Sequence, residues 1–496
     1  MSDASEVVLV NSPVVRSAAN WLAHWASLGP DETALVIEGV GTFTFGELAV
    51  SVASMAKLLA EAGMPSGALV GIESADQHAH IIALLASDAL GACTVSFSAD
   101  DLARGDALVG RCDWLLSAAA PRSTGLHQHW VRLDDSFADR VAATLVDAED
   151  VARLTRPVDP DKLTRITRSS GTTGDKKAFG HSMAQLTSHL IAREKVFGKV
   201  NRDVAAICLY QLPTYVAYHY LISGLYNGNT ICMISIENFD RVVAELPKFF
   251  VDVVQGQLPL LIEKYTTGFQ WSHWRFINII GAQVPVSIWE HLYPQRFARA
   301  YNGYSTSEMN AFSFSYHGDY YTILDDAEAR IVDDHGHPVA PGAVGMIEIR
   351  SPRMARGYLW NPELTQKHFV DGWFRTYDVG AMPAPGRLMV GGRGDDLINI
   401  GGIKISPSVY EAALRTIPGV KDAVLIGIPD HNMLEQLHVV VEGDKLVLDD
   451  PLAAAIRQAV AGTCNDCWTH VMAKLPRTET GKVRRGELRV LFAPTA

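Results

Sequence analysis

The sequence has no apolar run long enough to cross a bilayer, and its first residues carry no secretion signal. The most apolar long segment, residues 81–95, is interrupted by Asp88 and is shorter than the ~20 residues that a transmembrane helix needs. The N-terminal stretch, residues 1–17, has no basic segment followed by an apolar core. We therefore expect no signal peptide and no membrane insertion.

Cysteine is scarce, and negative charge exceeds positive charge. Six cysteines in 496 residues are too few for a disulfide framework, so we expect a reducing compartment, the cytoplasm. Cys464 and Cys467 form one CxxC near His470, but a structural zinc usually takes four ligands, so we interpret them as ordinary thiols. The net charge of −12 argues against a general electrostatic grip on nucleic acid or anionic lipid.

The composition is that of a soluble globular protein, with 48% hydrophobic and 20% charged residues. A chain of 496 residues is too long for one core, so we expect two or more domains. Strand-like and helical patterns alternate through the first 150 residues, which favours parallel α/β units. The predicted elements are a helix at 45–63, a strand at 68–74, a helix at 78–90, and strands at 93–98, 231–235, 251–256 and 276–281.

The pattern changes from about residue 320, where short alternating runs cut by Gly and Pro predict antiparallel β-structure. After residues 391–396 comes a compact end piece with a helix at 408–416, two strands, a helix at 452–461 and a basic tail. We predict a mixed α/β (α+β) fold class. A large N-terminal domain of α/β sheets with a β-rich subdomain spans residues 1–393, and a small mobile α+β domain spans 394–496.

Residues 169–177, Ser-Ser-Gly-Thr-Thr-Gly-Asp-Lys-Lys, concentrate groups that bind phosphate. Glycines let a backbone fold around an anion, and the hydroxyls and ammonium groups supply further donors. The spacing is neither that of a Walker A loop nor GxGxxG. Taken alone, such a loop is more often a flexible surface turn.

Five further segments follow the loop in a fixed order, and with it they resemble the motifs of the adenylate-forming superfamily. That superfamily comprises acyl- and aryl-CoA synthetases, the adenylation domains of peptide synthetases, and luciferases. The first 160 residues have a similar strand–helix texture but no diagnostic motif. The matching segments are 304–308 (YSTSE), 345–363, 373–380 (WFRTYDVG), 392–411 and 475–485 (LPRTETGKVRR).

The resemblance implies a ligase reaction in two halves. A carboxylate attacks the α-phosphate of ATP, giving an acyl-adenylate and pyrophosphate, and a thiol then takes the acyl group and releases AMP. The implied cofactors are ATP, Mg²⁺ and coenzyme A. The implied partners are a small-molecule carboxylic acid and CoA, with a holo-carrier protein acting in trans as the alternative acceptor; a homodimer is left open, as is a non-catalytic nucleotide-binding protein of the same fold.

The resemblance also implies a role for each motif residue. The loop would hold the β- and γ-phosphates, where positioning and charge neutralisation dominate catalysis. Glu308 would bind Mg²⁺ through a hard carboxylate oxygen, and Lys482 would donate to the charge developing at the α-phosphate. The implied catalytic residues are Lys482, Thr173 and Glu308, and the implied ATP and AMP contacts are Ser169, Ser170, Gly171, Thr172, Thr173, Gly174, Lys177, Gly281, Ala282, Gln283, Tyr304, Ser305, Thr306, Ser307, Asp378 and Arg393.

Within that set, Asp378 and Arg393 would bind the ribose, and Tyr304 would stack on adenine. Each residue also has a plain structural alternative. Glu308 could be a helix-capping residue, Asp378 a turn former and Lys482 a solvated tail charge.

The hinge of the implied domain rotation is Asp395. One orientation would deliver Lys482, and the other would bring Gly402 beside the thiol tunnel, because glycine leaves room for a narrow pantetheine arm. Lys176, Ser305, Ser307 and Tyr377 depart from the family motifs, yet none of these departures removes a charged catalytic group.

The acyl pocket is predicted within residues 210–228, which contain no Asp or Glu. A pocket for an α-amino acid would need a carboxylate to pair the substrate ammonium, so aromatic or polycyclic acids are favoured. The alternatives are that the aromatic stripe is core and that His219 is a packed helix residue. The candidate pocket residues are Tyr215, Tyr218, His219, Gly281 and Tyr304.

Overall fold

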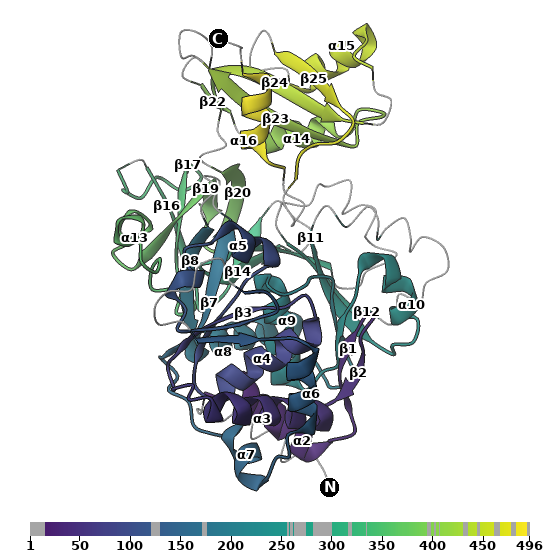
Figure 1. Cartoon of the computed structure of the whole chain (residues 1–496). Coiled ribbons are helices and arrows are strands. Elements are labelled where there is room, and N and C mark those ends of the chain that lie inside the picture. The colour runs from purple at the N-terminus through teal and green to yellow at the C-terminus, as the bar shows by residue number, and fades with distance from the viewer. Residues whose placement is uncertain are drawn as a thin grey trace.

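The structure is a computed structural model that shows a large lobe of helices and sheets and a small lobe at the C-terminal end (Figure 1). The fold is mixed α/β, as predicted. No helix of the described part is long and apolar enough to cross a membrane. The described residues are 15–120, 129–170, 176–254, 257, 261, 274–280, 300–315, 320–333, 335–393, 398–400, 403–405, 407–429, 435–443, 447–460, 467–477 and 483–493.

One sheet of six strands has the order β6-β5-β3-β4-β7-β8, and every pair in it is parallel except β7–β8. Parallel neighbours need crossover connections, and helix α4 (Gln77–Ala89) supplies the one between β3 and β4. The strands are β3 (Leu69–Glu73), β4 (Cys93–Ser96), β5 (Trp114–Ser117), β6 (His129–Arg132), β7 (Leu163–Ser170) and β8 (Lys176–Ser182). The helices of this part are α2 (Ala18–Leu28), α3 (Phe45–Glu61), α4 (Gln77–Ala89), α5 (Ala99–Arg104), η1 (Val109–Arg111), α6 (Asp135–Ala143) and α7 (Ala148–Arg153).

Helix starts follow from local sequence signals. The Thr44 side chain accepts from the Glu47 backbone N–H and the Glu47 carboxylate accepts from Thr44, which forms a capping box at the start of α3. Gly63, with φ +90°, stands just beyond the end of that helix. The helix predicted at 45–63 is thereby confirmed. The same box at Ser182 and Gln185 begins α8 (Met183–Phe197).

A second, 14-stranded sheet is parallel in one half and antiparallel in the other. Its antiparallel half confirms the β-structure predicted from about residue 320. The parallel half, with β2 antiparallel at its edge, contains β1 (Thr33–Ile37), β2 (Gly41–Thr44), β9 (Ala205–Cys208), β10 (Ile231–Met233), β11 (Phe249–Val254), β12 (Trp274–Ile280) and β13 (Ala300–Thr306). The antiparallel half contains β14 (Asn310–Ser315), β15 (Tyr321–Ile323), β16 (Glu328–Val332), β17 (Val344–Arg350), β18 (Phe369–Val370), β19 (Trp373–Ala384) and β20 (Arg387–Arg393); the helices are α9 (Tyr215–Asn227), η2 (Ile236–Asn238), α10 (Phe239–Val243) and α13 (Pro362–His368).

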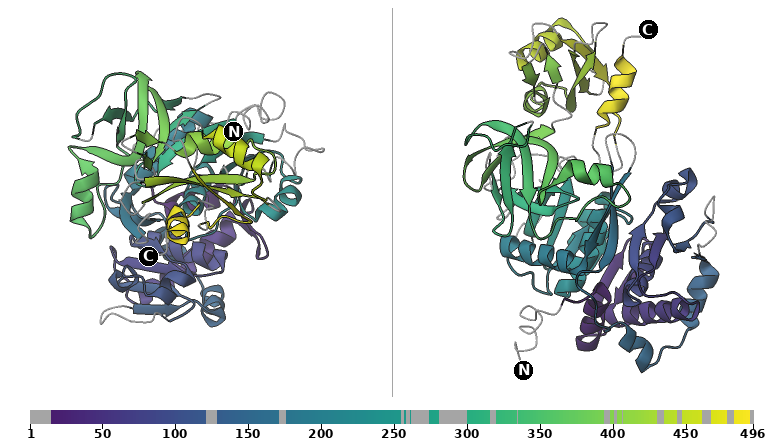
Figure 2. Two further views of the ribbon diagram at one scale, coloured as in Figure 1. Left: turned by 90° about the horizontal axis from the view of Figure 1, so that it is seen from above. Right: turned by 90° about the vertical axis from the view of Figure 1, so that its left-hand side faces the viewer.

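The main hydrophobic core joins the two sheets through the helices between them. It includes Trp25 of α2, Leu84 of α4, Leu186 of α8 and Leu225 of α9. The Trp25 indole Nε1 also donates to the Leu225 carbonyl at 2.7 Å, which ties α2 to α9. Figure 2 shows these helices packed against the sheets of the large lobe. The core therefore holds α8 and α9 in place beside the strands that carry the motifs.

The strands that follow β20 pair only with one another among the described strands. They bury two clusters, one on each side of the β23-β24-β25 sheet. Residues 394–397, with the hinge Asp395, lie outside the described part of the chain, so the boundary at 393/394 stays a prediction. The elements are β21 (Ile398–Ile400), β22 (Ile403–Ile405), β23 (Asp422–Pro429), β24 (Glu435–Glu442), β25 (Trp468–Met472), α14 (Pro407–Leu414), α15 (Asp450–Ala459) and α16 (Arg485–Phe492).

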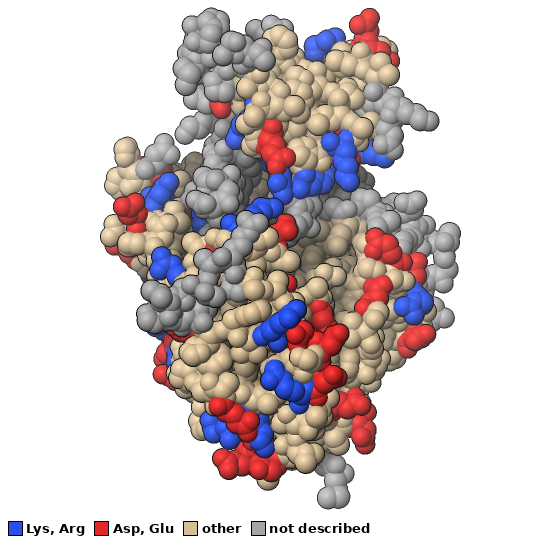
Figure 3. Space-filling view, in the orientation of Figure 1, with Lys and Arg blue, Asp and Glu red and all other residues tan. Residues whose placement is uncertain are grey.

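Cysteines of the described part are free thiols. Burial raises the pKa of Cys112 and Cys208 to about 12, which keeps both protonated. Cys467 is half-buried, and Cys464 lies outside the described residues. On the face shown in Figure 3, acidic and basic side chains are mixed over the large lobe.

Candidate active site

The phosphate-loop segment connects the two strands of a hairpin. The strand after it, β8, pairs antiparallel with β7, with Ser169 opposite Lys177. Arg168 anchors the hairpin, since its guanidinium donates to Asp101 at 2.6 Å and to Asp106 at 2.8 Å. Lys177 Nζ lies 5.7 Å from the ring centroid of Tyr358.

Glu308 lies just after β13, at the end of the YSTSE segment. Its side chain is buried, with 8% of the residue exposed. Oε1 accepts from the Tyr358 hydroxyl at 2.9 Å, and the Glu308 carbonyl accepts from the Ala355 N–H at 2.8 Å. Glu308 caps no described helix, because β14 follows the turn at 307–309. A buried carboxylate held through one oxygen is suited to a hard cation with phosphate and water as its other ligands.

Two residues that are predicted to bind the nucleotide, Tyr304 and Asp378, are joined by a hydrogen bond. The Tyr304 hydroxyl donates to Asp378 Oδ2 at 2.5 Å. Asp378 stands opposite Arg393 in the β19–β20 ladder, so the pair predicted for the ribose is brought together along the backbone. The Thr376 hydroxyl accepts from the Asp378 N–H at 3.0 Å, which fixes the strand at this point. Asp378 is therefore a strand residue with an oriented carboxylate, in place of the turn former considered as its alternative.

The end of β13 also presents an unused hydroxyl. Thr306 Oγ1 is buried and makes no hydrogen bond within the described part of the chain. Leaving a buried hydroxyl without a partner costs about 1–3 kcal/mol, so this atom fits a donor that a ligand oxygen would satisfy. Ser305, also in β13, is exposed, and Ser307, in the turn that follows, is half-buried.

The aromatic residues of α9 divide between two surroundings. The Tyr215 ring stacks on His181, with centroids 5.6 Å apart, and meets His219 edge-on at 5.0 Å. Tyr218 is 3% exposed and lies under the Arg165 guanidinium, 4.5 Å from its ring centroid. The structure thus brings Tyr215 and His219 together and places Tyr218 in the core.

Buried histidines adjoin this group, and sequence reasoning did not single them out. Both ring nitrogens of His181 lack a hydrogen-bond partner within the described residues. Burial lowers the pKa of His181 to about 4, and the Ser307 backbone opposes that shift. Burial also lowers the pKa of His189, whose ring centroid lies 4.2 Å from that of His219. These imidazoles are neutral at neutral pH.

Other predicted site residues fall outside the described part of the chain. This holds for most of the phosphate loop, the predicted nucleotide contacts at 281–283, the hinge, the tunnel glycine and the catalytic lysine. Within the described residues, no cluster of three or more His, Cys, Asp or Glu could hold a metal by itself. The residues outside the described part are Gly171, Thr172, Thr173, Gly174, Gly281, Ala282, Gln283, Asp395, Gly402 and Lys482, and for Ser170 and Arg393 only the backbone is described.

Comparison with known sequences shows the family to which this chain belongs. A family model described as AMP-binding enzyme matches residues 22–359. Feruloyl-CoA synthase from Amycolatopsis sp is 28% identical over 505 residues, covering 95% of this chain and 98% of that protein. The 3-hydroxybenzoate–CoA ligase from Aromatoleum sp. (strain CIB) is 27% identical over 354 residues, 68% of each chain. The match to long-chain-fatty-acid–CoA ligase from Escherichia coli O157:H7, 23% identical, covers 66% of this chain and 62% of that protein, so this chain spans less than two thirds of its length.

Solved structures share the fold. The anthranilate CoA ligase AuaEII in complex with anthranoyl-AMP superposes with a TM-score of 0.84 at 20% identity, covering 98% of this chain and 99% of that chain. ATP-bound MatB from Rhodopseudomonas palustris has a TM-score of 0.82 at 21% identity, with 96% and 99% covered. The predicted fold class is confirmed by both.

Proposed function

Because the chain belongs to the family of AMP-binding enzymes, we propose that it is an AMP-forming carboxylate–CoA ligase. The observation that carries this proposal is the hydrogen bond between Tyr304 and Asp378 at 2.5 Å, with Arg393 opposite Asp378 in the ladder. These residues come from three separate motifs, and they meet where the resemblance assigns the nucleoside. Glu308 and the unused hydroxyl of Thr306 follow Tyr304 on the same strand and turn.

In the first half-reaction, a carboxylate oxygen of the acid attacks the α-phosphorus of ATP. The bond between the α-phosphorus and its bridging oxygen breaks, and pyrophosphate leaves. The chain positions the phosphates through the loop and Lys177, and Lys482 donates to the charge that develops at the α-phosphate. Glu308 would hold Mg²⁺, which supplies charge neutralisation at the phosphates when bound.

In the second half-reaction, the CoA sulfur attacks the acyl carbon, loses its proton and displaces AMP. The C-terminal domain from residue 394 would rotate about Asp395 between the two steps and bring Gly402 beside the thiol. A carrier-bound phosphopantetheine thiol has the same reactive end, so it is the acceptor against which CoA is tested. The buried, protonated thiols of the described part suit the reducing cytoplasm.

For the acid, we propose an aryl carboxylate. Tyr215, His181 and His219 form a contiguous aromatic group at the start of α9, and His181 is uncharged at neutral pH. A planar ring can stack in such a group, whereas an ammonium would have no counter-charge in the segment 210–228. The relatives feruloyl-CoA synthase and 3-hydroxybenzoate–CoA ligase are named for acids of this class.

The test is ATP–pyrophosphate exchange with aryl, polycyclic, short and long acyl acids, with Mg²⁺ and without thiol. Exchange with aryl acids, followed by product release on adding CoA, is the expected result. Lys482→Ala should abolish exchange and leave ATP binding largely intact, and Lys474→Ala, an exposed lysine of the same tail, is the matched control. Exchange that persists in Lys482→Ala would contradict the role of that lysine. Acyl transfer to a holo-carrier alone would contradict CoA as the acceptor.

A further inference from the structure

Tyr358 lies between two of the residues assigned to the metal–triphosphate. Its hydroxyl donates to Glu308 Oε1 at 2.9 Å, and the face of its ring lies 5.7 Å from Lys177 Nζ. The residue is 5% exposed. Glu308 and Lys177 belong to motifs more than a hundred positions apart in the sequence, so a single side chain connects them.

The ring of Tyr358 is held from several sides. Phe179, His368 and Phe369 each meet it edge-on, at centroid distances of 6.4, 5.9 and 5.5 Å. The backbone bridges to Phe179 of β8, and the Tyr358 N–H donates to Thr365 Oγ1 at 2.9 Å. A ring enclosed in this way keeps one rotamer, so the direction of its O–H bond toward Glu308 is set by packing.

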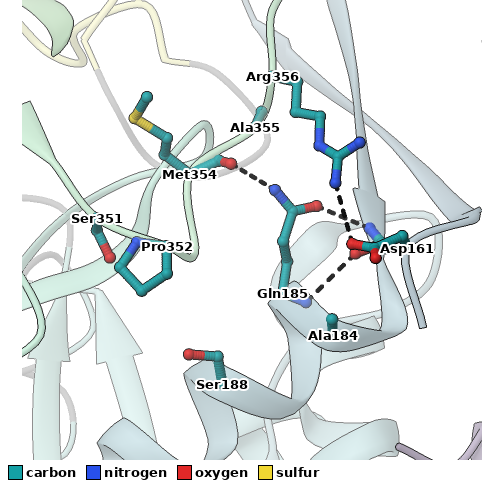
Figure 4. Close-up of a pocket in the computed structure, with 10 residues that line it drawn as sticks. Asp161, Ala184, Gln185, Ser188, Ser351, Pro352, Met354, Ala355 and Arg356 are labelled. Atoms are coloured by element: carbon teal, nitrogen blue, oxygen red, sulfur yellow. Dashed lines mark hydrogen bonds and ion pairs between the residues drawn. The ribbon is translucent and has the colours of Figure 1, made fainter. Parts of the chain in front are cut away.

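The segment that leads to Tyr358 is hydrogen-bonded both to α8 and to the turn that carries Glu308. Gln185, in the first turn of α8, donates its amide to the Met354 carbonyl at 2.5 Å, as Figure 4 shows. The next residue, Ala355, donates its N–H to the Glu308 carbonyl at 2.8 Å. After Tyr358, the Leu359 N–H donates to the Ala178 carbonyl at 2.8 Å. Residues 354–359 therefore fasten β8 and α8, which follow the phosphate loop, to the turn that carries Glu308.

The hydrogen bond to Oε1 determines which oxygen of Glu308 is available. Oε2 forms no hydrogen bond within the described part of the chain, so it remains free to bind a cation. The ring face attracts the Lys177 ammonium by a cation–π interaction.

We propose that Tyr358 is a positioning residue that orients the Glu308 carboxylate and the Lys177 ammonium for the magnesium–triphosphate. This inference rests on the proposed function, in which Glu308 holds Mg²⁺. The residue acts through its hydroxyl and its ring and takes no part in the chemistry. Its loss should therefore weaken the binding of Mg²⁺ and ATP and leave the affinity for the acid unchanged.

The experiment is a Mg²⁺ titration of ATP binding, read by calorimetry, with pyrophosphate exchange as a second readout. Tyr358→Phe keeps the ring and removes only the hydroxyl. Because a hydrogen bond to a charged group is lost, we expect the Mg²⁺ concentration for half-maximal ATP binding to rise about tenfold. The matched control is Tyr321→Phe, since Tyr321 is 3% exposed, belongs to the same buried cluster and donates its hydroxyl to Asn302 Oδ1 at 2.6 Å.

The two variants should differ in the Mg²⁺ midpoint while their melting temperatures without nucleotide stay alike. Equal Mg²⁺ midpoints for Tyr358→Phe and Tyr321→Phe would overturn the inference. Glu308→Gln separates it from the proposed function. A shifted midpoint in Glu308→Gln with an unshifted one in Tyr358→Phe defeats the inference alone, whereas an unshifted midpoint in Glu308→Gln defeats the metal role of Glu308 itself.

Discussion

The Tyr304 hydroxyl donates a hydrogen bond to Asp378 Oδ2 at 2.5 Å, which joins two strands whose motifs lie 74 positions apart. Oxygen-to-carboxylate hydrogen bonds of this length are among the strong ones in proteins. The bond orients a carboxylate assigned to the ribose before any nucleotide arrives. Preorganisation of this kind lowers the cost of binding.

Tyr304→Phe should raise the KM for ATP about tenfold, because the Asp378 carboxylate loses a fixed donor and must be oriented by the ligand itself. The ring remains, so the KM for the acid should stay the same. Exchange kinetics with ATP and acid varied in turn measure both. Tyr226→Phe, whose ring packs edge-on against Trp21 at 5.3 Å, is a control distant from the site in sequence. An equal rise in both constants would contradict the assignment.

Glu348 is fully buried between two arginines of the β16-β17-β19 ladder. Its carboxylate accepts from Arg330 Nε and from Arg375 Nε, each at 2.7 Å. Glu348→Gln should lower the free energy of unfolding by about 3 kcal/mol, since removing one partner of a buried pair leaves the other charges uncompensated. Urea denaturation measures the change.

The control for that variant lies two residue pairs along the same ladder, where Glu328 stands opposite Arg350 as Arg330 stands opposite Glu348. The Glu328 and Arg350 side chains are 59% and 47% exposed, so Glu328→Gln should change the free energy of unfolding by less than about 1 kcal/mol. If both variants cost the same, burial is not the reason for the effect.

The small lobe should lose stability in mild acid. His438 Nδ1 and His470 Nε2 lie 2.9 Å apart, and burial, with the neighbouring His470, lowers the pKa of His438 to about 4. Burial also lowers the pKa of His470. In the folded state the pair stays neutral while the unfolded chain takes protons below pH ~6.5, so stability is full above that pH and falls toward pH 4.

Hydrogen exchange of β24 and β25 in urea, at neutral and mildly acidic pH, measures this loss. His438→Phe keeps a ring beside Trp468, whose centroid is 6.0 Å away, and should remove most of the acid sensitivity. His335→Phe alters an exposed histidine and should leave the pH dependence of hydrogen exchange unchanged. If His438→Phe keeps the same pH dependence of hydrogen exchange, the acid sensitivity of the small lobe comes from other groups.

Gly228 should tolerate no side chain. It ends α9 with φ +72°, and an added Cβ would lie 2.6 Å from the Trp25 ring. Gly228→Ala combines backbone strain with a clash against a packed indole, so we expect a loss of about 3 kcal/mol in the free energy of unfolding. Gly39, with φ +74° and nothing within 4 Å of an added Cβ, isolates the backbone part, and Gly39→Ala should cost about 1 kcal/mol. Thermal or urea unfolding compares the two, and equal losses would rule out the clash.

Local signals made much of the fold predictable. The capping residues Thr44 and Ser182 and the Gly63 stop define helix limits through contacts within a few positions. The strand β8 was missed because residues 176–182 mix lysines, glycine and a histidine, and only pairing with β7 makes them a strand. Helix α9 was ambiguous for another reason. It is aromatic or apolar around most of its circumference, so its pattern does not say which face meets the core.

The sequence by itself determined the order of the motifs and the family, because these depend on residue types at short spacings. Tertiary structure alone decided which side chains meet. It placed Tyr218 beneath Arg165 but Tyr215 against His181, and it brought Tyr358 between Glu308 and Lys177. Such contacts join residues far apart in the chain, and they arise from the packing of whole strands and helices, which no short window of sequence contains.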